Sequence, residues 1–302
     1  MFSTRLPGTL DTNAVTAAVD RMRTAGTPFI DLTETNPTAA GITYPADLLS
    51  ALAAPAALTY APEPLGLPAA RQAAAAEMSR QGAPIPPDRV VMTASTSEAY
   101  SLLFKLLCDP GDVVLIPQPS YPLFEMLSRL DGVATAPYRL THHDGWSLDR
   151  RSIELAVTPR TKAVLVVSPN NPTGSVITAD DAAWLDTFAA SRHLAVIADE
   201  VFLDYAIDPS KTLTSIRGSR ALTFSLGGLS KSAGLPQVKL GWMGLTGPAA
   251  LVDDALARLE LIADTYLSVS TPVQVAAADL IARGGVVRDA IRQRVAANLV
   301  AL

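Results

Sequence analysis

The sequence has few of the residues that form covalent or metal cross-links. Its 302 residues include one cysteine, Cys108, and three histidines. A single cysteine excludes an internal disulfide and is typical of a protein of the reducing cytosol. The histidines have no carboxylate or cysteine cluster at ligand spacing, so we expect no metal site. Cys108 follows the apolar run LLFKLL, where a buried small side chain is a better interpretation than a nucleophile.

Excess positive charge and long apolar runs are also absent. The net charge is −5, with 24 Lys and Arg against 29 Asp and Glu. Nucleic acids and membrane surfaces select basic patches, so neither is an expected partner. No stretch reaches the ~20 apolar residues of a membrane span, and the N-terminus lacks the apolar core of a signal peptide. We therefore expect a cytoplasmic protein.

Short apolar runs alternate with segments of helical spacing from about residue 89 onward. Strands are predicted at RVVMT, VVLIP, ATAPYRL, AVLVVSP, LAVIADE, ALTFSL and KLGWMGLTG. Helices are predicted at SEAYSLLFKLL, YPLFEMLSRL, SIELAVT, TADDAAWLDTFAASR and PAALVDDALARLELIA, with one more at each end of the chain. This alternation predicts an α/β fold with a mostly parallel, doubly wound sheet.

Polar stretches follow four of the predicted strands. They read ASTS, SPNNPTG, DE and SLGGLSKS. Ligands of doubly wound sheets bind beyond the carboxyl ends of the strands, so we expect these stretches to converge on one crevice.

Lys231, in LGGLSKSAGLPQVKLGW, allows several interpretations. A phosphate-binding P-loop needs a glycine directly before its Lys-Ser pair, and Ser230 occupies that place here. No strand is followed by the dinucleotide glycine fingerprint. A solvated turn and a lysine that is bonded to a cofactor remain.

Four motifs, in this order, resemble the aspartate aminotransferase family: SPNNPTG, ADEVF, LSKS and a following K-x-G-W. The resemblance extends from NPT at residue 36 to the final helix. It implies a fold-type I enzyme that uses pyridoxal 5′-phosphate (PLP). It also implies a large PLP-binding domain at residues 46–285, and a small domain built from 1–45 and 286–302 whose C-terminal part is missing from this chain.

The resemblance assigns the chemistry to two residues. Lys231 matches the lysine that forms a Schiff base with PLP and, once free, moves the substrate's α-proton. Asp199 matches the carboxylate that pairs with the protonated pyridine nitrogen, which keeps the ring an electron sink. A solvated lysine and a capping acid are the structural alternatives.

The resemblance also implies a set of binding residues. Asn171 would donate to the ring's phenolic oxygen, and Tyr121 would stack on the ring. Tyr60 would reach the phosphate of a neighbouring subunit, and Asn36 would lie near the substrate. The remaining residues would surround the cofactor phosphate: Ser95, Thr96, Ser97, Ser230 and Lys239. Capping, turn and core roles stay open for these side chains.

Three positions depart from the family's pattern. Lys239 replaces an arginine, which keeps the charge but loses the bidentate fork, and Gly228 replaces a phosphate-binding serine. Phe202 replaces a tyrosine that donates to the phenolic oxygen. We expect Phe202 to raise the pKa of the lysine–PLP aldimine unless Tyr205 substitutes.

The resulting functional prediction is a homodimeric aminotransferase with shared active sites. It would move an amino group between an amino acid and a 2-oxo acid. A PLP-dependent β-lyase or decarboxylase on the same fold is an alternative, because such enzymes share the same core residues. A truncated, non-catalytic PLP-binding paralogue is another, because no residue can be given the role of the C-terminal arginine that grips the substrate carboxylate.

Overall fold

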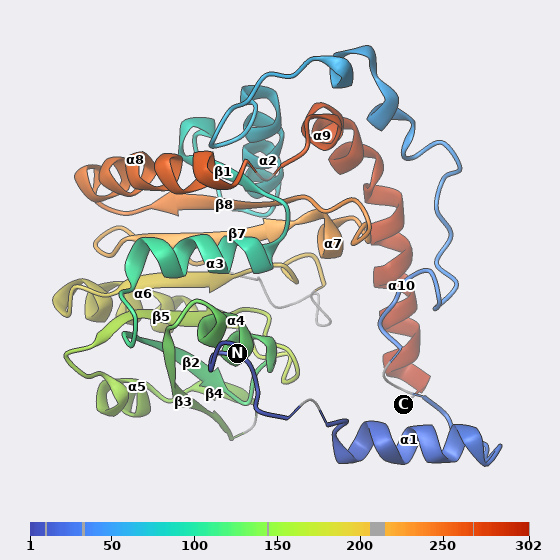
Figure 1. Cartoon of the computed structure of the whole chain (residues 1–302), viewed down its shortest axis with the longest axis horizontal. Helices are drawn as coiled ribbons and strands as arrows, with labels where there is room; N and C mark the ends of the chain where they lie inside the picture. Colours follow the sequence, from blue (N-terminus) through green and yellow to red (C-terminus); the bar gives the residue numbers. More distant parts are fainter. Residues whose placement is uncertain (10, 32–33, 144, 206–214, 268, 302) are drawn as a thin grey trace. The chain divides into compact units, whose positions relative to one another are not determined.

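The computed structural model describes residues 1–9, 11–31, 34–143, 145–205, 215–267 and 269–301. The chain divides into two compact units, Met1–Thr43 and Tyr44–Leu302. The first unit contains helix α1 (Ala14–Thr24), whose N-terminus is capped by the side chain of Asn13. The second unit contains the sheet and the other helices (Figure 1).

The described residues of the second unit form one eight-stranded sheet in the order β1-β8-β7-β6-β5-β2-β3-β4. Strands β7, β6, β5, β2 and β3 run parallel, β8 lies antiparallel between β7 and β1, and β4 is an antiparallel addition to β3. The strands are β1 (Val90–Thr93), β2 (Val113–Gln118), β3 (Ala134–His142), β4 (Trp146–Leu148), β5 (Thr161–Val167), β6 (Ala195–Asp199), β7 (Thr223–Gly228) and β8 (Gly241–Thr246). The predicted α/β, mostly parallel fold is confirmed.

Nine further helices belong to this unit's described residues: α2 (Pro68–Arg80), α3 (Thr96–Leu107), α4 (Leu123–Leu130), α5 (Arg150–Ala156), α6 (Ala179–Ser191), α7 (Leu229–Ser232), α8 (Ala249–Tyr266), α9 (Thr271–Arg283) and α10 (Gly285–Ala301). Short 3₁₀ turns span Ser50–Ala53, Pro55–Leu58 and Pro87–Arg89. The sequence pattern did not predict α2, α9 or β4. No helix among the described residues is long and apolar enough to cross a membrane.

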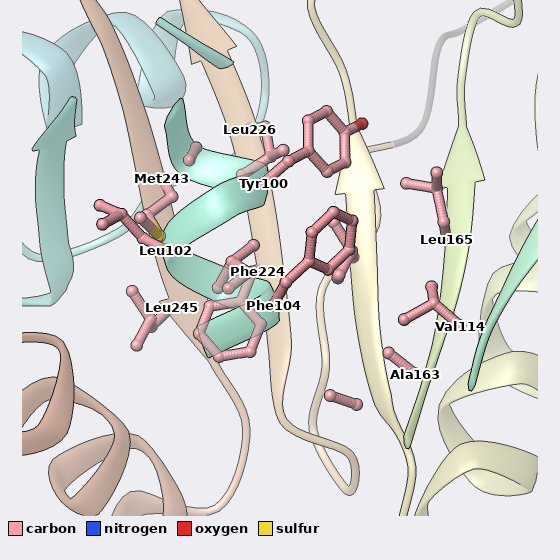
Figure 2. Close-up of a cluster of buried hydrophobic side chains, with 14 of the residues drawn as sticks. Tyr100, Leu102, Phe104, Val114, Ala163, Leu165, Phe224, Leu226, Met243 and Leu245 are labelled. Carbon is pink, nitrogen blue, oxygen red and sulfur yellow. The ribbon is translucent and has the colours of Figure 1, made fainter. Parts of the chain in front are cut away.

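The two faces of the sheet carry separate apolar cores. Along β6, Ala195 and Ile197 face the helices α3, α4 and α8, while Val196 and Ala198 face α5 and α6. Because side chains alternate along a strand, this pattern places Asp199 on the α3 face and Glu200 toward the opposite face. Figure 2 shows the α3 core, in which the ring of Tyr100 joins the apolar cluster and its oxygen points away from it.

The sheet topology brings the predicted polar stretches to one edge. Strands β2, β5, β6 and β7 are parallel and so end at the same edge. Strand β1 also ends there, and β8 begins there, because β8 is antiparallel to both of its neighbours. Gly228 at the end of β7 pairs with Gly241 at the start of β8, and Gly241 also pairs with Thr93.

Candidate active site

A buried carboxylate lies at the centre of this edge. Asp199 ends β6 and is 7% exposed. Its Oδ2 accepts a hydrogen bond of 2.7 Å from the Tyr100 hydroxyl, and its Oδ1 accepts one of 3.2 Å from the backbone N–H of Val201. Burial raises the pKa of Asp199 above its usual range, while the two hydrogen bonds and the positive charge of Lys231 act in the opposite direction.

Tyr100 is a site residue that the sequence did not reveal. It lies on α3, one turn after the helix begins, and packs edge-on against Phe124 with ring centroids 5.2 Å apart. Burial and the neighbouring carboxylate of Asp199 raise its pKa, so the hydroxyl stays protonated and donates. A helical face of Ala99, Leu102 and Leu103 predicts burial for Tyr100, and only the fold supplies its acceptor.

Lys231 lies on α7, the single turn that follows β7 (Figure 1). Its side chain is exposed, and Nζ lies 5.8 Å from the centroid of the Phe202 ring. The charge of Lys231 opposes the rise in the pKa of Asp199 that burial causes. The turn that carries Lys231 thus follows β7, the strand that lies next to the one that Asp199 ends.

The N-terminus of α3 opens onto the same edge. Ser95 caps the helix by accepting from the Glu98 N–H at 3.1 Å, and Glu98 in turn accepts from the Ala94 N–H at 2.6 Å. Thr96 and Ser97 form the first turn, whose N–H groups have no acceptor within the helix and favour an anion.

Two glycines let the backbones approach closely beside this turn. A Cβ on Gly241 would lie 2.9 Å from Thr93 Oγ1 and 3.0 Å from the carbonyl carbon of Ser95. A Cβ on Gly228 would lie 3.0 Å from the Leu240 oxygen and 3.1 Å from Gly241 Cα. A serine at position 228, as the family pattern expects, would therefore crowd the start of β8.

Ser230 and Lys239 are the other two residues predicted to bind the phosphate, and they precede β8 in the chain. Ser230 is half-buried on α7. Lys239 is exposed and has a left-handed backbone with φ of 62°, just before β8 begins. The Lys239 side chain is therefore accessible to solvent, two residues before Gly241.

Tyr121 and Asn171 come from two neighbouring loops of the same edge. The loops are joined by a hydrogen bond of 3.0 Å from Ser120 Oγ to Asn170 Oδ1. Asn170 is buried and also donates to the Pro119 oxygen and to Thr173 Oγ1, so it is a loop-building residue. Tyr121 and Asn171 are both exposed, and the Tyr121 ring lies edge-on to Phe124 at 6.2 Å.

Two further binding residues were predicted, Tyr60 and Asn36, and each is described within its own unit. Tyr60 is 77% exposed and follows the 3₁₀ turn Pro55–Leu58. Asn36 belongs to the first unit, where its Oδ1 accepts from the N–H and hydroxyl of Thr38 at 3.1 and 2.6 Å.

Tyr205 does not stand in for a tyrosine at position 202. Its hydroxyl donates to the backbone oxygen of Lys231 at 2.5 Å, and its ring lies edge-on to Phe202 with centroids 6.5 Å apart. The hydroxyl that the family pattern has at position 202 is therefore lacking in Phe202, and the Tyr205 hydroxyl is bonded to the Lys231 backbone instead.

Glu200 belongs to a different environment from Asp199. It accepts hydrogen bonds from Ser215 Oγ and the Ile216 N–H, and Arg217 Nη2 lies 3.9 Å from its Oε2. Burial raises the pKa of Glu200 to about 7, although these three partners oppose the shift. These contacts give Glu200 a structural role on the side of β6 opposite to Asp199.

The described residues contain no group of three or more His, Cys, Asp or Glu side chains that could hold a metal ion. Burial raises the pKa of the Cys108 thiol to about 12, which disfavours the reactive thiolate.

Comparison with known proteins identifies the family. The family model described as aminotransferase class I and II matches residues 27–298, and the chain belongs to this family. Alanine aminotransferase of Mycobacterium tuberculosis is 33% identical over 190 residues, covering 62% of this chain and 44% of that protein. Nicotianamine aminotransferase A of Hordeum vulgare is 32% identical over 211 residues, covering 68% and 45%. The predicted family is confirmed.

Solved structures give the same result for the fold. The alanine aminotransferase of Pyrococcus furiosus has a TM-score of 0.79 at 28% identity, covering 93% of this chain and 71% of that one. The N-succinyldiaminopimelate aminotransferase of Mycobacterium tuberculosis has a TM-score of 0.76 at 27% identity, covering 100% and 79%. The chain spans slightly less than half the length of the first curated relatives that it matches.

Proposed function

We propose that this chain carries the catalytic core of a PLP-dependent aminotransferase, which moves an amino group between an amino acid and a 2-oxo acid. The observation that carries the proposal is the placement of a buried carboxylate, Asp199, at the end of β6 and of Lys231 on the turn α7 that follows the adjacent strand β7. The relatives named alanine and nicotianamine aminotransferase support the reaction class.

The residues at the sheet edge fit PLP. A pyridinium needs a buried anion, and Asp199 is one whose Oδ2 is already oriented by Tyr100. A phosphate needs N–H donors and a close backbone approach, which the first turn of α3 and Gly241 offer. When bound, PLP supplies an electron sink for the bonds at the substrate's α-carbon.

Each side chain has a proposed part in holding the cofactor or moving a proton. Lys231 would bond covalently to PLP and, with its amine free, would accept the proton from the substrate's α-carbon. Asp199 keeps the pyridine nitrogen protonated. Asn171 and Tyr121 orient the ring. The phosphate is held by Ser95, Thr96, Ser97, Ser230 and Lys239.

The assembly and the substrate remain part of the proposal. A homodimer would bring Tyr60 of one subunit to the phosphate of the other, and the exposure of Tyr60 leaves it free to do so. Asn36 is proposed to lie near the substrate. The large domain at residues 46–285, the small domain formed by 1–45 and 286–302, and a cytosolic location complete this proposal.

The test combines a spectrum with product analysis. The purified chain mixed with PLP should develop a visible band, and borohydride should trap the cofactor on the peptide that holds Lys231. Lys231→Ala is the control and should trap nothing. A panel of amino acids should then yield pyridoxamine phosphate and 2-oxo acids, whereas release of pyruvate and ammonia would instead identify a β-lyase. A chain that takes up no PLP would refute the proposal.

A further inference from the structure

The turn that carries Lys231 is too short to satisfy its own carbonyl groups. α7 comprises only Leu229–Ser232. The last four carbonyl groups of any helix have no N–H donor within the helix, so in this short turn every carbonyl needs a donor from outside. The oxygen of Leu229 accepts from the N–H groups of Ala233 and Leu235 at 3.2 and 3.0 Å. The oxygen of Lys231 receives only weak backbone contacts, from the N–H of Ala233 and, at 3.4 Å, from that of Gly234. The turn therefore depends on donors from elsewhere.

Two tyrosines from distant segments supply such donors. The Tyr205 hydroxyl donates to the oxygen of Lys231 at 2.5 Å, and the Tyr44 hydroxyl donates to the oxygen of Gly234 at 2.5 Å. Burial raises the pKa of both phenols, so both stay protonated and able to donate. The carbonyl of Lys231 and the carbonyl of Gly234 are thus held by side chains from two segments that lie far apart in the sequence.

Helix α10 closes the turn from another side. Gly234 has φ of 61°, and a Cβ there would lie 2.9 Å from side-chain atoms of Val287 and Ile291. Arg288 of the same helix, ion-paired with Glu77 at 3.3 Å, directs its Nη1 toward the Ser232 oxygen at 3.4 Å. The turn therefore has little room to shift as long as its carbonyl partners stay in place.

We propose that Tyr205, assisted by Tyr44, is a positioning residue that fixes the backbone of Lys231 and so aims its amine at the site. The inference rests on the proposed function, because it gives Tyr205 a role that acts through Lys231. Tyr205 holds the lysine in two ways, by its hydroxyl on the Lys231 oxygen and by its ring against Phe202, whose own ring lies 5.8 Å from Lys231 Nζ.

Tyr205→Phe removes the hydroxyl and keeps the ring. Tyr138→Phe is the matched control, because the Tyr138 hydroxyl also donates to a backbone oxygen, that of Leu165 at 2.8 Å, within the core on the α5 and α6 face. Thermal unfolding of both variants measures any general loss of stability. If Tyr205→Phe does not fold, Tyr44→Phe removes the other donor to the same turn and takes its place.

The first measurement needs no cofactor. The PLP-free protein is treated with a trace of acetic anhydride, and mass spectrometry of peptides gives the labelling of Lys231 relative to that of Lys162. We expect the ratio to rise roughly two- to tenfold in Tyr205→Phe, the range that one neutral hydrogen bond covers, because the amine is no longer held at Phe202. It should stay at the wild-type value in Tyr138→Phe. An unchanged ratio in Tyr205→Phe would overturn the proposal.

The second measurement separates the lysine from the rest of the site. PLP can bond to Lys231, whereas pyridoxine 5′-phosphate has the same ring and phosphate but no aldehyde. Tyr205→Phe should weaken PLP binding roughly two- to tenfold and leave the Kd of pyridoxine 5′-phosphate unchanged. Equal weakening of both ligands would overturn the proposal. A wild-type protein that never bonds PLP would refute the proposed function, and the labelling ratio would still decide whether Tyr205 positions Lys231.

Discussion

The two sides of the end of β6 hold neighbouring acids in opposite ways. Asp199 faces α3, where the Tyr100 hydroxyl and the Val201 N–H donate to its oxygens. The charge of Lys231, on the turn after the next strand, opposes the rise in its pKa. Glu200 faces the other way, where Ser215, Ile216 and Arg217 surround it. Burial raises the pKa of both acids. Burial alone therefore does not distinguish the acid of the candidate site, since both acids lie at the end of β6 and only Asp199 faces the α3 side, where Tyr100 donates to it.

The largest expected effect comes from neutralising each acid in turn. Asp199→Asn should lower the rate of the half-reaction with an amino acid roughly 100-fold. Removing one charge of a buried pair costs on the order of 3 kcal/mol, and each 1.36 kcal/mol is tenfold in rate. Glu200→Gln should stay within about threefold of wild type. Stopped-flow absorbance of the PLP-loaded protein measures both rates.

Equal losses in these two variants would contradict the division between the two sides of β6. The Kd of PLP should be determined for each variant beforehand, so that rates are compared at saturation.

The second effect concerns stability, and it belongs to Glu200. Between pH 4.5 and about 7 the folded protein keeps a proton on Glu200 that the unfolded chain has released. Unfolding then releases a proton, so the free energy of unfolding falls as the pH rises through this window, by on the order of 3 kcal/mol. Glu200→Gln has no such proton and should lose this part of the slope.

Urea unfolding of the PLP-free protein at several pH values provides the measurement. Identical slopes for wild type and Glu200→Gln would show that Glu200 is ionised in the folded state throughout.

A third, smaller effect distinguishes the hydrogen-bond donors of the two acids. Tyr100→Phe and Ser215→Ala each remove one hydroxyl, and each should lower the free energy of unfolding by about 1 kcal/mol. Only Tyr100→Phe should also slow the half-reaction, by roughly tenfold, because it frees Asp199 Oδ2. Urea unfolding and the same stopped-flow assay compare them. A loss of rate in Ser215→Ala that matches its loss of stability would contradict the prediction that only the donor to Asp199 affects the half-reaction.

The sequence predicted the sheet because its strands are short apolar runs that end in polar motifs. The same pattern predicted that the polar stretches with Asp199, Lys231 and the α3 N-terminus lie at one edge of the sheet, since parallel strands end at the same edge. The helix α2 was missed because its alanine-rich composition gives almost no amphipathic pattern, although five of its residues are buried.

The supporting residues of the site could not be predicted from local pattern. Tyr100, Tyr205 and Tyr44 are single tyrosines whose acceptors lie 99, 26 and 190 positions away along the chain. No spacing rule connects such pairs, because they meet only after the sheet has formed. The departures at Gly228 and Phe202 were visible in the sequence, but only the geometry shows that Gly228 lies against the start of β8.

The last expected effect, similar in size to the third, concerns Phe202, in the turn that follows β6. Phe202→Tyr should place a hydroxyl where the family pattern has one, near Lys231 Nζ. We expect the pH midpoint of the visible band of bound PLP to fall by about one unit, which corresponds to ~1.4 kcal/mol, because the added donor favours the deprotonated form of the chromophore.

The double variant Phe202→Tyr with Tyr205→Phe should show the same midpoint as Phe202→Tyr, since the Tyr205 hydroxyl donates to the Lys231 oxygen and not to the ring of the cofactor. A spectrophotometric pH titration decides between the outcomes. Equal midpoints for wild type and Phe202→Tyr would show that the missing hydroxyl at position 202 has no influence on the cofactor.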